Sequence, residues 1–438
     1  MSNRPEPLAE HYPPLSRHEA LVESNRCLYC YDAPCTHACP THIDIPKFIK
    51  KISTDNISGS ARAIFDSNLM GATCARVCPV QELCEGACVL GSEHKPIMIG
   101  RLQRYAMDHA YSTGQLPFPP STKSSQSIAV IGAGPAGLSC AGELARRGYP
   151  VTIYEKRDLA GGLSTYGIIG LREPVPVSLA EVELIKRLGV KIETSQELGA
   201  NLQWEDLRHN HDAIFLAVGL GSATNLDIEN EDYIVDGLAY IEQSKLGHLP
   251  PRIGHSVVVI GAGNTAIDCA TIAKRTGADR VTLIYRRTDR EMTAYPHEYD
   301  FIKKEGVDFR FLTQPVAVIL DQGKVTDLRC VRMTLGAPDA SGRPTPTPEP
   351  GSEFLIPADQ IVKAIGQKKL SLAAQLGLIT DNGHIRVSPA TLETSVEKVY
   401  AGGDAIRARG AASTVMAVQD GKLAAQAIHK HFEAQHNG

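Results

Sequence analysis

The sequence predicts an α/β protein in which a cysteine-rich helical segment is followed by two Rossmann-like nucleotide-binding folds, the second inserted in the first. Eight of the eleven cysteines lie between residues 27 and 88. Two glycine-rich turns, beginning at residues 132 and 261, each follow a short apolar run typical of a buried strand. A further strand-like run and glycine turn near residue 400 would return the chain to the first fold. The expected domains are therefore residues 1–126, residues 127–225 with 367–438, and residues 226–366.

Composition and charge exclude several classes of partner. The chain has 438 residues and a net charge of −4, so it lacks the basic surface that binds nucleic acid or an anionic membrane. No run of about 18 apolar residues suggests a membrane-spanning helix. The first residues show no export or transit signal, so we expect a cytoplasmic protein. In a reducing compartment, clustered cysteines favour a metal site over disulfides.

The cysteines form two runs of similar length. These are Cys27-x2-Cys30-x4-Cys35-x3-Cys39 and Cys74-x3-Cys78-x5-Cys84-x3-Cys88. An iron–sulfur cluster needs several thiolates converging from short, bent segments, and this spacing supplies them twice. Zinc is the alternative, because two CxxC-like groups can bind it. Zinc ribbons usually repeat C-x2-C, which occurs only once here, so the runs favour an α-helical domain with two [4Fe–4S] clusters.

The division of ligands between the clusters follows from a ferredoxin rule. In bacterial two-cluster ferredoxins, the fourth cysteine of a run serves the other cluster. Applied here, the rule leaves the first cluster with three thiolates, and Cys74 could complete it by count alone. The expected first set is Cys27, Cys30 and Cys35. The expected second set is Cys39, Cys78, Cys84 and Cys88.

Helix-like apolar spacing surrounds these runs. It extends over residues 46–55, 59–68 and 97–111, with the cysteine runs as loops between short helices. The Pro- and Ser-rich stretch 116–126 is typical of a linker, and it places a domain boundary before the first nucleotide fold.

The first glycine fingerprint predicts a dinucleotide site, which we assign to FAD. Gly132 allows a tight turn, Gly134 lets the backbone approach a pyrophosphate, and Gly137 lets the helix pack on the strand. Pro135 and Ala136 complete this turn. Glu155 ends the next strand, where its carboxylate can accept a hydrogen bond from the ribose 2′-OH.

Later segments are expected to complete the same site. Gly162 and Leu163 form a second glycine-rich approach, and Asp404, after Gly403, can accept a hydrogen bond from the ribitol. A helix beginning near residue 413 offers backbone N–H groups and its positive dipole end to the flavin. The further candidates in this site are Arg172, Ser413, Thr414 and Val415.

The second fingerprint, Gly261-x-Gly263-x-x-Ala266, predicts a pyridine nucleotide site that includes Asn264 and Thr265. The next strand ends in arginine instead of an acidic residue, which favours the 2′-phosphate of NADPH over NADH. A solvated basic turn is the alternative. The two arginines are Arg286 and Arg287. Residues 336–354 are expected to form an extended surface loop, and the strand at 360–367 contributes Ala364 and Gly366.

Taken together, these motifs resemble the pyridine nucleotide-disulfide oxidoreductase superfamily fused to an iron–sulfur module. Glutamate synthase small subunits and the N-terminal half of dihydropyrimidine dehydrogenase have this build. The resemblance covers nearly the whole chain. Its carriers are RCLYCYDAPCTHACP, CARVCPVQELCEGAC, GRLQRY, GAGPAGL, GAGNTAID and YAGGD.

The resemblance implies finer assignments. The spacing between Cys78 and Cys84 is similar to that of dihydropyrimidine dehydrogenase, and the L-Q motif implies that Gln103, in place of Cys74, is the fourth ligand of the first cluster. The chain thus resembles the electron-input subunit of a bacterial dihydropyrimidine dehydrogenase. It would pass electrons from NAD(P)H through FAD and two [4Fe–4S] clusters to an FMN- and Fe–S-containing subunit that reduces uracil or thymine. The alternative is a glutamate synthase small subunit or a related NAD(P)H-dependent electron-transfer subunit, and no catalytic side chain is assigned.

Overall fold

The computed structural model describes residues 8–114, 118, 124–249, 254–339, 342–407 and 413–436. The chain divides into two compact units. The larger unit comprises His11–Thr165, Arg172–Gly221 and Lys369–Gly438, and the smaller comprises Met1–Glu10, Tyr166–Leu171 and Ser222–Lys368. The nucleotide domain expected at 226–366 falls within the smaller unit, whereas both the cysteine-rich segment and the first nucleotide fold lie in the larger unit.

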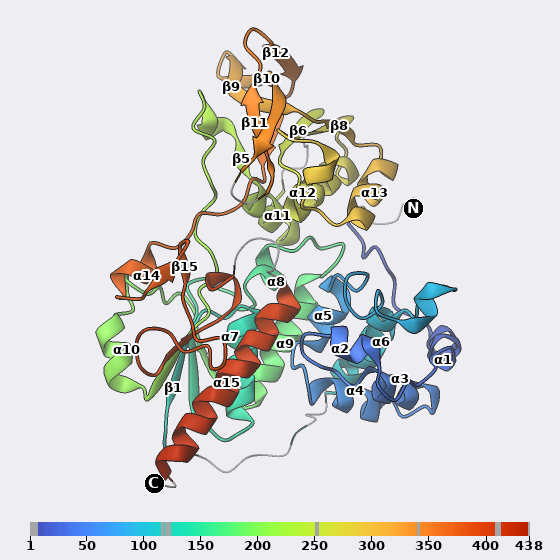
Figure 1. Cartoon of the computed structure of the whole chain (residues 1–438), viewed down its shortest axis with the longest axis vertical. Helices are drawn as coiled ribbons and strands as arrows, with labels where there is room; N and C mark the ends of the chain where they lie inside the picture. Colours follow the sequence, from blue (N-terminus) through green and yellow to red (C-terminus); the bar gives the residue numbers. More distant parts are fainter. Residues whose placement is uncertain are drawn as a thin grey trace. The chain divides into compact units, whose positions relative to one another are not determined.

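The larger unit begins with a group of short helices (Figure 1). They are α1 (Arg17–Asn25), α2 (Pro34–Ala38), α3 (Ile45–Ser53), α4 (Ile57–Phe65), α5 (Gly71–Val77), the 3₁₀ turn η1 (Val89–Ser92) and α6 (Ile99–Thr113). Asp44 and Asn56 cap α3 and α4 by accepting from the backbone N–H groups of Lys47 and Gly59. Their apolar faces are buried, as the spacing predicted, with Ile49 and Ile64 at most 1% exposed.

A parallel sheet follows in the order β16-β4-β1-β2-β3, and it is the first nucleotide fold. Its strands are β1 (Ile128–Ile131), β2 (Val151–Tyr154), β3 (Lys191–Glu193), β4 (Ala213–Leu216) and β16 (Val399–Ala401). Because β16 comes from the C-terminal part of the chain, the sheet is completed only after the smaller unit. This confirms the predicted fold class, with the second nucleotide fold inserted in the first.

Helices and short elements complete this sheet. They are α7 (Pro135–Ala145), α8 (Leu163–Tyr166), α9 (Val175–Arg187), α10 (Trp204–Asn210), α14 (Leu372–Gln375), β14 (Thr380–Asp381), β15 (His384–Ile385), η4 (Gly403–Ala405) and α15 (Thr414–His436). Helices α7 and α15 lie side by side (Figure 1). Gly421 makes this approach possible, since a Cβ there would meet the Cys140 backbone nitrogen at 2.7 Å.

One hydrophobic core joins the N-terminal helices to this sheet. Ile49 and Leu102 from the helices belong to the same buried cluster as Val130 and Leu144 from the nucleotide fold. Glu181 of α9 also accepts from the Ala72 N–H of α5 at 2.8 Å. Dense packing of this kind holds the cysteine-rich helices in a fixed place relative to the first nucleotide fold.

The smaller unit contains a second parallel sheet, in the order β5-β13-β6-β7-β8. Its elements are β5 (Val235–Asp236), α11 (Gly237–Lys245), β6 (Ser256–Ile260), α12 (Asn264–Arg275), β7 (Arg280–Ile284), η3 (Asp289–Glu291), α13 (Pro296–Lys304), β8 (Asp308–Arg310) and β13 (Gln360–Lys363), with η2 (Glu231–Tyr233) before β5. An antiparallel sheet is added to it by β9 (Thr313–Asp321), β10 (Lys324–Pro338), β11 (Pro344–Pro348) and β12 (Phe354–Pro357).

The expectation of a loop over residues 336–354 was wrong in part. Residues Pro344–Pro348 form β11, which pairs antiparallel with β10. Prolines occupy every second position of this strand. Because proline has no backbone N–H, one side of the strand lacks hydrogen-bond donors at all three positions. Such a strand is tolerated only at a sheet edge, and β11 is the edge strand of its sheet.

Within the part of the chain that the structure describes, no helix is long and apolar enough to cross a membrane.

Candidate functional site

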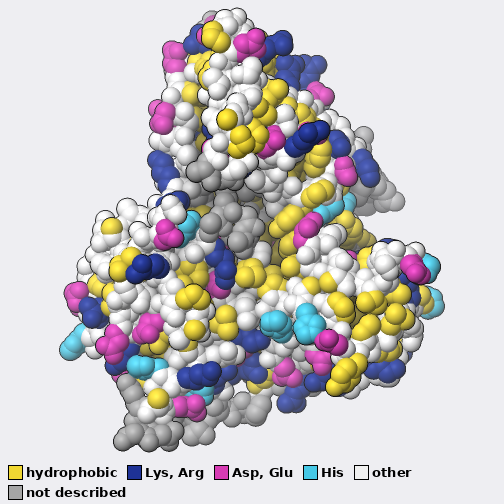
Figure 2. Space-filling view, viewed as in Figure 1, with side chains coloured by type: hydrophobic (Ala, Val, Ile, Leu, Met, Phe, Trp, Pro, Cys, Tyr) yellow, Lys and Arg dark blue, Asp and Glu magenta, His cyan; other side chains and the backbone are white. Residues whose placement is uncertain are grey.

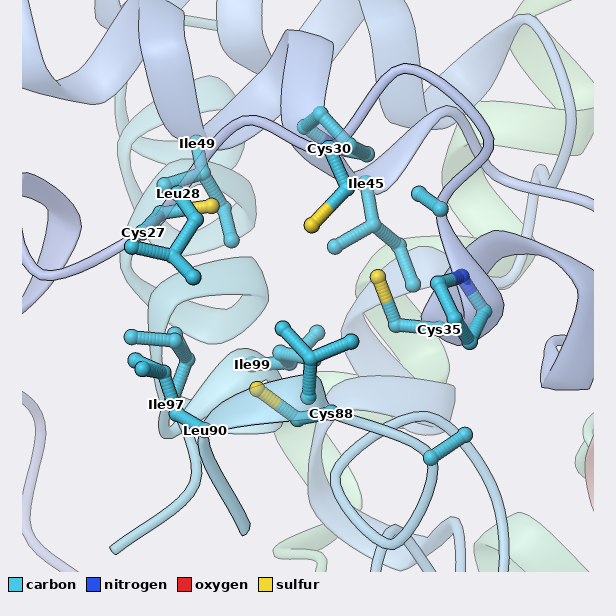
Figure 3. A pocket seen from close by; sticks show the side chains of 15 residues that line it. Cys27, Leu28, Cys30, Cys35, Ile45, Ile49, Cys88, Leu90, Ile97 and Ile99 are labelled. Atoms are coloured by element: carbon cyan, nitrogen blue, oxygen red, sulfur yellow. The ribbon is translucent and has the colours of Figure 1, made fainter. Parts of the chain in front are cut away.

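Four cysteines surround a first cavity between the N-terminal helices. Cys27, Cys30, Cys35 and Cys88 line it, and Figure 3 shows their sulfur atoms pointing into a common space. The rest of the wall is apolar, with Ile45, Ile49, Ile97 and Ile99 among the side chains shown. The space between these side chains, part of it open to solvent, is about 380 Å³. We refer to it as the first cavity.

A second cavity lies close by in the same unit. Cys39, Cys74, Cys78 and Cys84 line it, together with Gln103 of α6 and Val415 of α15. Gln103 is 7% exposed, and its side-chain Nε2 donates to the Gly71 carbonyl at 2.8 Å. This hydrogen bond connects α6 to the beginning of α5 and fixes the amide at the wall of the second cavity.

The electrostatic neighbours of the thiols give the same grouping. Burial raises the pKa of the Cys35 thiol to about 11, and Cys27 and Cys88 add to the effect. Burial also raises the pKa of Cys84, with Cys39 among its neighbours. Thiols with raised pKa values stay protonated unless a metal ion replaces the proton, so these groups would release protons when iron binds.

The structure changes the predicted partition in two places. Cys88 lies in the first cavity and not in the second, and Gln103 lies in the second cavity and not in the first. The crossover expected for Cys39 is present. The second run shows the reciprocal arrangement, because Cys84 lines the second cavity and Cys88 the first. The ferredoxin rule, applied to both runs instead of the first alone, gives this division.

A [4Fe–4S] cluster takes four protein ligands, but five candidates line the second cavity: Cys39, Cys74, Cys78, Cys84 and Gln103. Cys78 and Cys74 form a thiol–thiol hydrogen bond, which is the first cause of the raised pKa of Cys78. The ligands of a cubane cluster sit at separate corners, farther apart than hydrogen-bonded thiols. We therefore infer that Cys74 is not a separate ligand and that Gln103 completes a set with Cys39, Cys78 and Cys84.

The same spread of sulfur atoms argues against zinc. Among the described residues, no three His, Cys, Asp or Glu side chains converge closely enough to hold a single metal ion. Tetrahedral zinc requires all of its sulfur ligands within about 2.3 Å of one atom. Thiols arranged around a cavity fit a larger inorganic cluster instead.

The predicted FAD residues assemble at the carboxyl end of the first sheet. Gly132 has a φ of 101°, a conformation that favours glycine. A Cβ on Gly162 would come within 2.7 Å of the Gly134 Cα, so the two glycine-rich segments approach each other closely. Among the described residues, a Cβ built on Gly134 would have one heavy atom within 4 Å, the Gly162 Cα at 4.0 Å, so the space beside Gly134 is otherwise open. The turn, with Pro135, Ala136 and Gly137 opening α7, is thus shaped to admit a pyrophosphate at a helix N-terminus.

Glu155 is held ready for a ribose. It is 6% exposed, and its carboxylate accepts from the backbone N–H groups of Ala133 at 2.7 Å and Arg157 at 2.8 Å. Arg172 and Leu163 are in the same unit, Arg172 half-buried and Leu163 exposed.

The C-terminal segment brings Asp404 and the start of α15 to this fold. Asp404 is half-buried, and burial raises its pKa, with Asp420 as the next cause. Asp420, which sequence reasoning missed, accepts from the Gly403 N–H at 2.9 Å and pairs with Arg407. Ser413 caps α15 by accepting from the Met416 N–H at 3.4 Å, ahead of Thr414.

Val415 connects two sites. It is 2% exposed, lies in the first turn of α15 and lines the second cavity. The helix N-terminus expected at the flavin is therefore also part of the wall of a thiol-lined cavity. Sequence reasoning assigned Val415 to the flavin alone, because residue 415 is far from the cysteines along the chain.

The second nucleotide turn lies in the smaller unit. Gly261 has a φ of 134°, and the Ala364 N–H donates to the Ile260 carbonyl at 2.8 Å, so Ala364 lies beside this turn. Asn264, next to Thr265 at the start of α12, accepts from the Tyr295 N–H at 3.1 Å. Gly366, with a φ of 99°, follows β13, and a Cβ on Gly263 would meet Thr293 at 3.2 Å.

The two predicted arginines differ in their surroundings. Arg287 is 6% exposed, donates to the Pro344 carbonyl at 2.9 Å and pairs with Asp339 at 3.6 Å. Arg286 is exposed. Arg343, which sequence reasoning missed, donates to the Tyr285 hydroxyl at 2.9 Å. Arg287 therefore anchors the antiparallel sheet, and Arg286 is the candidate for reading a 2′-phosphate.

Replacing Arg286 with alanine should weaken NADPH binding about tenfold or more and change NADH binding less than about twofold, because only NADPH carries the phosphate. Titration of the purified chain with each nucleotide measures this. Arg287→Ala is the comparison variant, and we expect it to lower the thermal unfolding midpoint instead. An equal loss of affinity for both nucleotides in Arg286→Ala would contradict the assignment.

Two family models match the chain. Residues 4–115 match dihydropyrimidine dehydrogenase domain II, with a 4Fe-4S cluster, and residues 126–421 match pyridine nucleotide-disulphide oxidoreductase. The first match supports the predicted iron–sulfur chemistry. The second covers more than half of the chain and agrees with the two nucleotide folds.

Curated relatives share this build. The NADP(+)-dependent formate dehydrogenase subunit beta of Moorella thermoacetica is 37% identical, over 91% of this chain and 60% of its own length. The glutamate synthase [NADPH] small chain of Escherichia coli (strain K12) is 33% identical, over 97% of this chain and 94% of its own length. The NAD-dependent dihydropyrimidine dehydrogenase subunit PreT of the same organism is 34% identical, with 94% of each chain covered.

Solved structures show the same fold. FprA of Mycobacterium tuberculosis in complex with NADPH matches with a TM-score of 0.59 and 18% identity, over 72% of this chain and 86% of that one. Thioredoxin reductase of T. acidophilum matches with a TM-score of 0.54 and 21% identity, over 72% of this chain and 100% of that one.

Proposed function

Because the chain belongs to the pyridine nucleotide-disulphide oxidoreductase family and carries a 4Fe-4S domain before it, we propose that it is the electron-input subunit of a larger oxidoreductase. The observation that carries this proposal is the position of Val415, which lies at the start of α15 and in the wall of the second cavity. A flavin held at that helix would be adjacent to one cluster, and the second cavity is close to the first.

The residues divide the work. The turn at Gly132 and Gly134, with Glu155, would hold FAD, and the turn at Gly261, with Arg286, would hold NADPH. The two cavities would hold [4Fe–4S] clusters. When bound, FAD accepts a hydride from a reduced pyridine nucleotide and releases electrons singly to iron–sulfur centres. The neutral amide at Gln103 would make the cluster in the second cavity less negative than four thiolates would.

For the acceptor, we propose an FMN- and Fe–S-containing subunit that reduces uracil or thymine to the 5,6-dihydropyrimidine. Two findings support it. The N-terminal match is to a domain named for dihydropyrimidine dehydrogenase, and the chain spans 94% of PreT, whose name describes a subunit of that enzyme. In contrast, it spans 60% of the formate dehydrogenase subunit, so that protein carries a large part that has no counterpart here.

A glutamate synthase small chain is the second candidate, and the nucleotide site favours it. PreT is named as NAD-dependent, whereas the glutamate synthase small chain is named as NADPH-dependent. Exposed Arg286 fits the 2′-phosphate of NADPH.

Reconstitution separates the two candidates. The purified chain, with its cofactors, is mixed under anaerobic conditions with the FMN- and Fe–S-containing subunit or with the glutamate synthase large chain of the same host. NADPH oxidation is followed by absorbance. Oxidation that depends on uracil supports the first candidate. Oxidation that depends on glutamine and 2-oxoglutarate overturns it in favour of the second.

A further inference from the structure

Large hydrophobic side chains are exposed next to the first cavity. Leu28 and Val89 are 61% and 43% exposed, and both also line the cavity. Tyr31, fully exposed, directly follows Cys30. We call these three residues the exit face. They lie at the solvent-exposed edge of the first cavity. Exposed hydrophobic side chains gathered at one functional position indicate an interaction surface.

The local backbone holds the exit face outward. Tyr29 has a φ of 51°, an uncommon conformation for a non-glycine residue, and its hydroxyl lies within hydrogen-bond distance of Ser24 O and Ser53 Oγ, each at 3.1 Å. Lys50 lies 4.6 Å from its ring centroid. Because Tyr29 is anchored inward in this way, its neighbours Leu28 and Tyr31 stand in solvent while Cys27 and Cys30 face the cavity. Uncommon backbone conformations of this kind persist where function requires them.

The surroundings of the exit face carry charges of both signs. Asp32 and His37 form an exposed pair at 2.5 Å, and near Val89 both Glu93 and Lys95 are exposed. Figure 2 likewise shows acidic, basic and histidine side chains mixed with hydrophobic ones over the region of α2 and α3. A mobile electron carrier is usually steered by one dominant sign of charge. An apolar centre with a mixed rim suits a subunit that stays bound.

We propose that the exit face is the docking surface for a permanently assembled electron-accepting subunit, whose redox centre lies near its own apolar contact face. This inference rests on the proposed electron-input function and adds the place where the partner binds. One electron at a time would cross the surface, reducing the partner's redox centre by one electron and leaving the first-cavity cluster oxidised by one. No bond forms and no proton moves.

The test uses Tyr31→Glu, because Tyr31 does not line the cavity and is fully exposed, so folding and cluster content should not change. Tyr233→Glu is the matched control, since Tyr233 is 46% exposed and lies in the smaller unit. Leu28→Gln is a second variant within the exit face. The probes are the two recombinant subunits used for reconstitution, and the readouts are co-elution on size exclusion and NADPH-dependent electron delivery.

Whichever probe binds the wild-type chain should bind Tyr31→Glu at least about tenfold more weakly, as expected for a tyrosine at the centre of an interface. Binding should change little between 0.05 and 0.5 M NaCl. Reduction of ferricyanide, a small acceptor, should be the same in Tyr31→Glu and Tyr233→Glu as in the wild type, since neither tyrosine lines a cavity. Undiminished binding by Tyr31→Glu, or loss of the wild-type complex in salt, overturns the proposal, and so does failure of both probes to bind. If only the glutamate synthase large chain binds and Tyr31→Glu weakens that complex, the proposed pyrimidine-reducing partner is wrong. The proposal that the exit face is the docking surface is then supported.

Discussion

Replacing Cys88 with alanine should abolish the cluster of the first cavity and leave the cluster of the second intact. Cys88 lines the first cavity with Cys27, Cys30 and Cys35, although it is only four residues from Cys84 in the second. Apart from the four cysteines, the side chains that line the first cavity are apolar, so none of them can replace a lost thiolate as a ligand. The variant should therefore contain about half of the wild-type iron.

Two reference variants show which of the two clusters Cys88→Ala has lost. Cys30→Ala removes a ligand of the first cavity and Cys84→Ala one of the second, so the reduced proteins provide an EPR spectrum for each remaining cluster. Cys88→Ala should match Cys30→Ala. The double variant of Cys30 and Cys88 should lose no more iron than either single variant, and that of Cys84 and Cys88 should lose nearly all. A Cys88→Ala spectrum that matches Cys84→Ala would restore the partition expected from the sequence.

The second cavity supplies the matching comparison. Gln103→Ala should give the spectrum of Cys84→Ala, because Gln103 lines that cavity. Cys74→Ala should retain both clusters, since Gln103 completes the second set in our assignment and the Cys74 thiol is hydrogen-bonded to Cys78 instead. Loss of the second cluster in Cys74→Ala, with retention in Gln103→Ala, would reverse the choice of fourth ligand.

Local patterns predicted much of the fold. The strand before Gly132, the helix after it and the carboxylate at Glu155 are all determined within one βαβ unit, and the structure has each of them. The helices around Ile49 and Ile64 follow in the same way from apolar spacing. Such features depend on residues close together in the chain, so a sequence pattern contains most of the information.

Tertiary packing determined the rest. Cys88 and Gln103 line other cavities than the predicted partition gave them. The place of Gln103 depends on how α6 packs against α5, which no spacing encodes. Arg287 occupies the position from which the motif predicts binding of a 2′-phosphate. Its guanidinium instead pairs with Asp339 and donates to the Pro344 carbonyl of the edge strand. A motif identifies a residue type at a position, but its partners come from distant segments.

A buried pair of carboxylates is the strongest example of a feature absent from local patterns. Glu173 and Glu181 are both fully buried, and the hydroxyl of Thr73, roughly a hundred residues earlier in the chain, is hydrogen-bonded to both carboxyl groups. A hydroxyl can donate only one proton, so one of the two carboxyl groups must carry a proton itself. Burial is the main cause that raises the pKa of Glu181 to about 8, and Glu173 adds to it.

This pair makes folding stability depend on pH in a definite direction. Glu181 has an ordinary pKa near 4.5 when unfolded and about 8 when folded, so between these values the folded chain holds a proton that the unfolded chain has lost. Stability therefore falls as pH rises through this window and levels off above it. The slope approaches about 1.4 kcal/mol per pH unit for one group. Tyr111 of α6 is a further titratable group near Glu181, and burial raises its pKa well above the usual range.

Glu181→Gln should remove most of this dependence, because glutamine can still accept from the Ala72 N–H and can donate to Thr73 without titrating. Between pH 6 and 8, the wild-type chain should lose about 2–3 kcal/mol relative to the variant, or roughly 2–5 °C in Tm. Thermal unfolding of the two proteins across that range measures the difference. Glu183→Gln is the control, since Glu183 is exposed on the same helix and should follow the wild type. Parallel curves for Glu181→Gln and the wild type would mean that Glu181 is ionised in the folded chain and that the shared proton resides elsewhere.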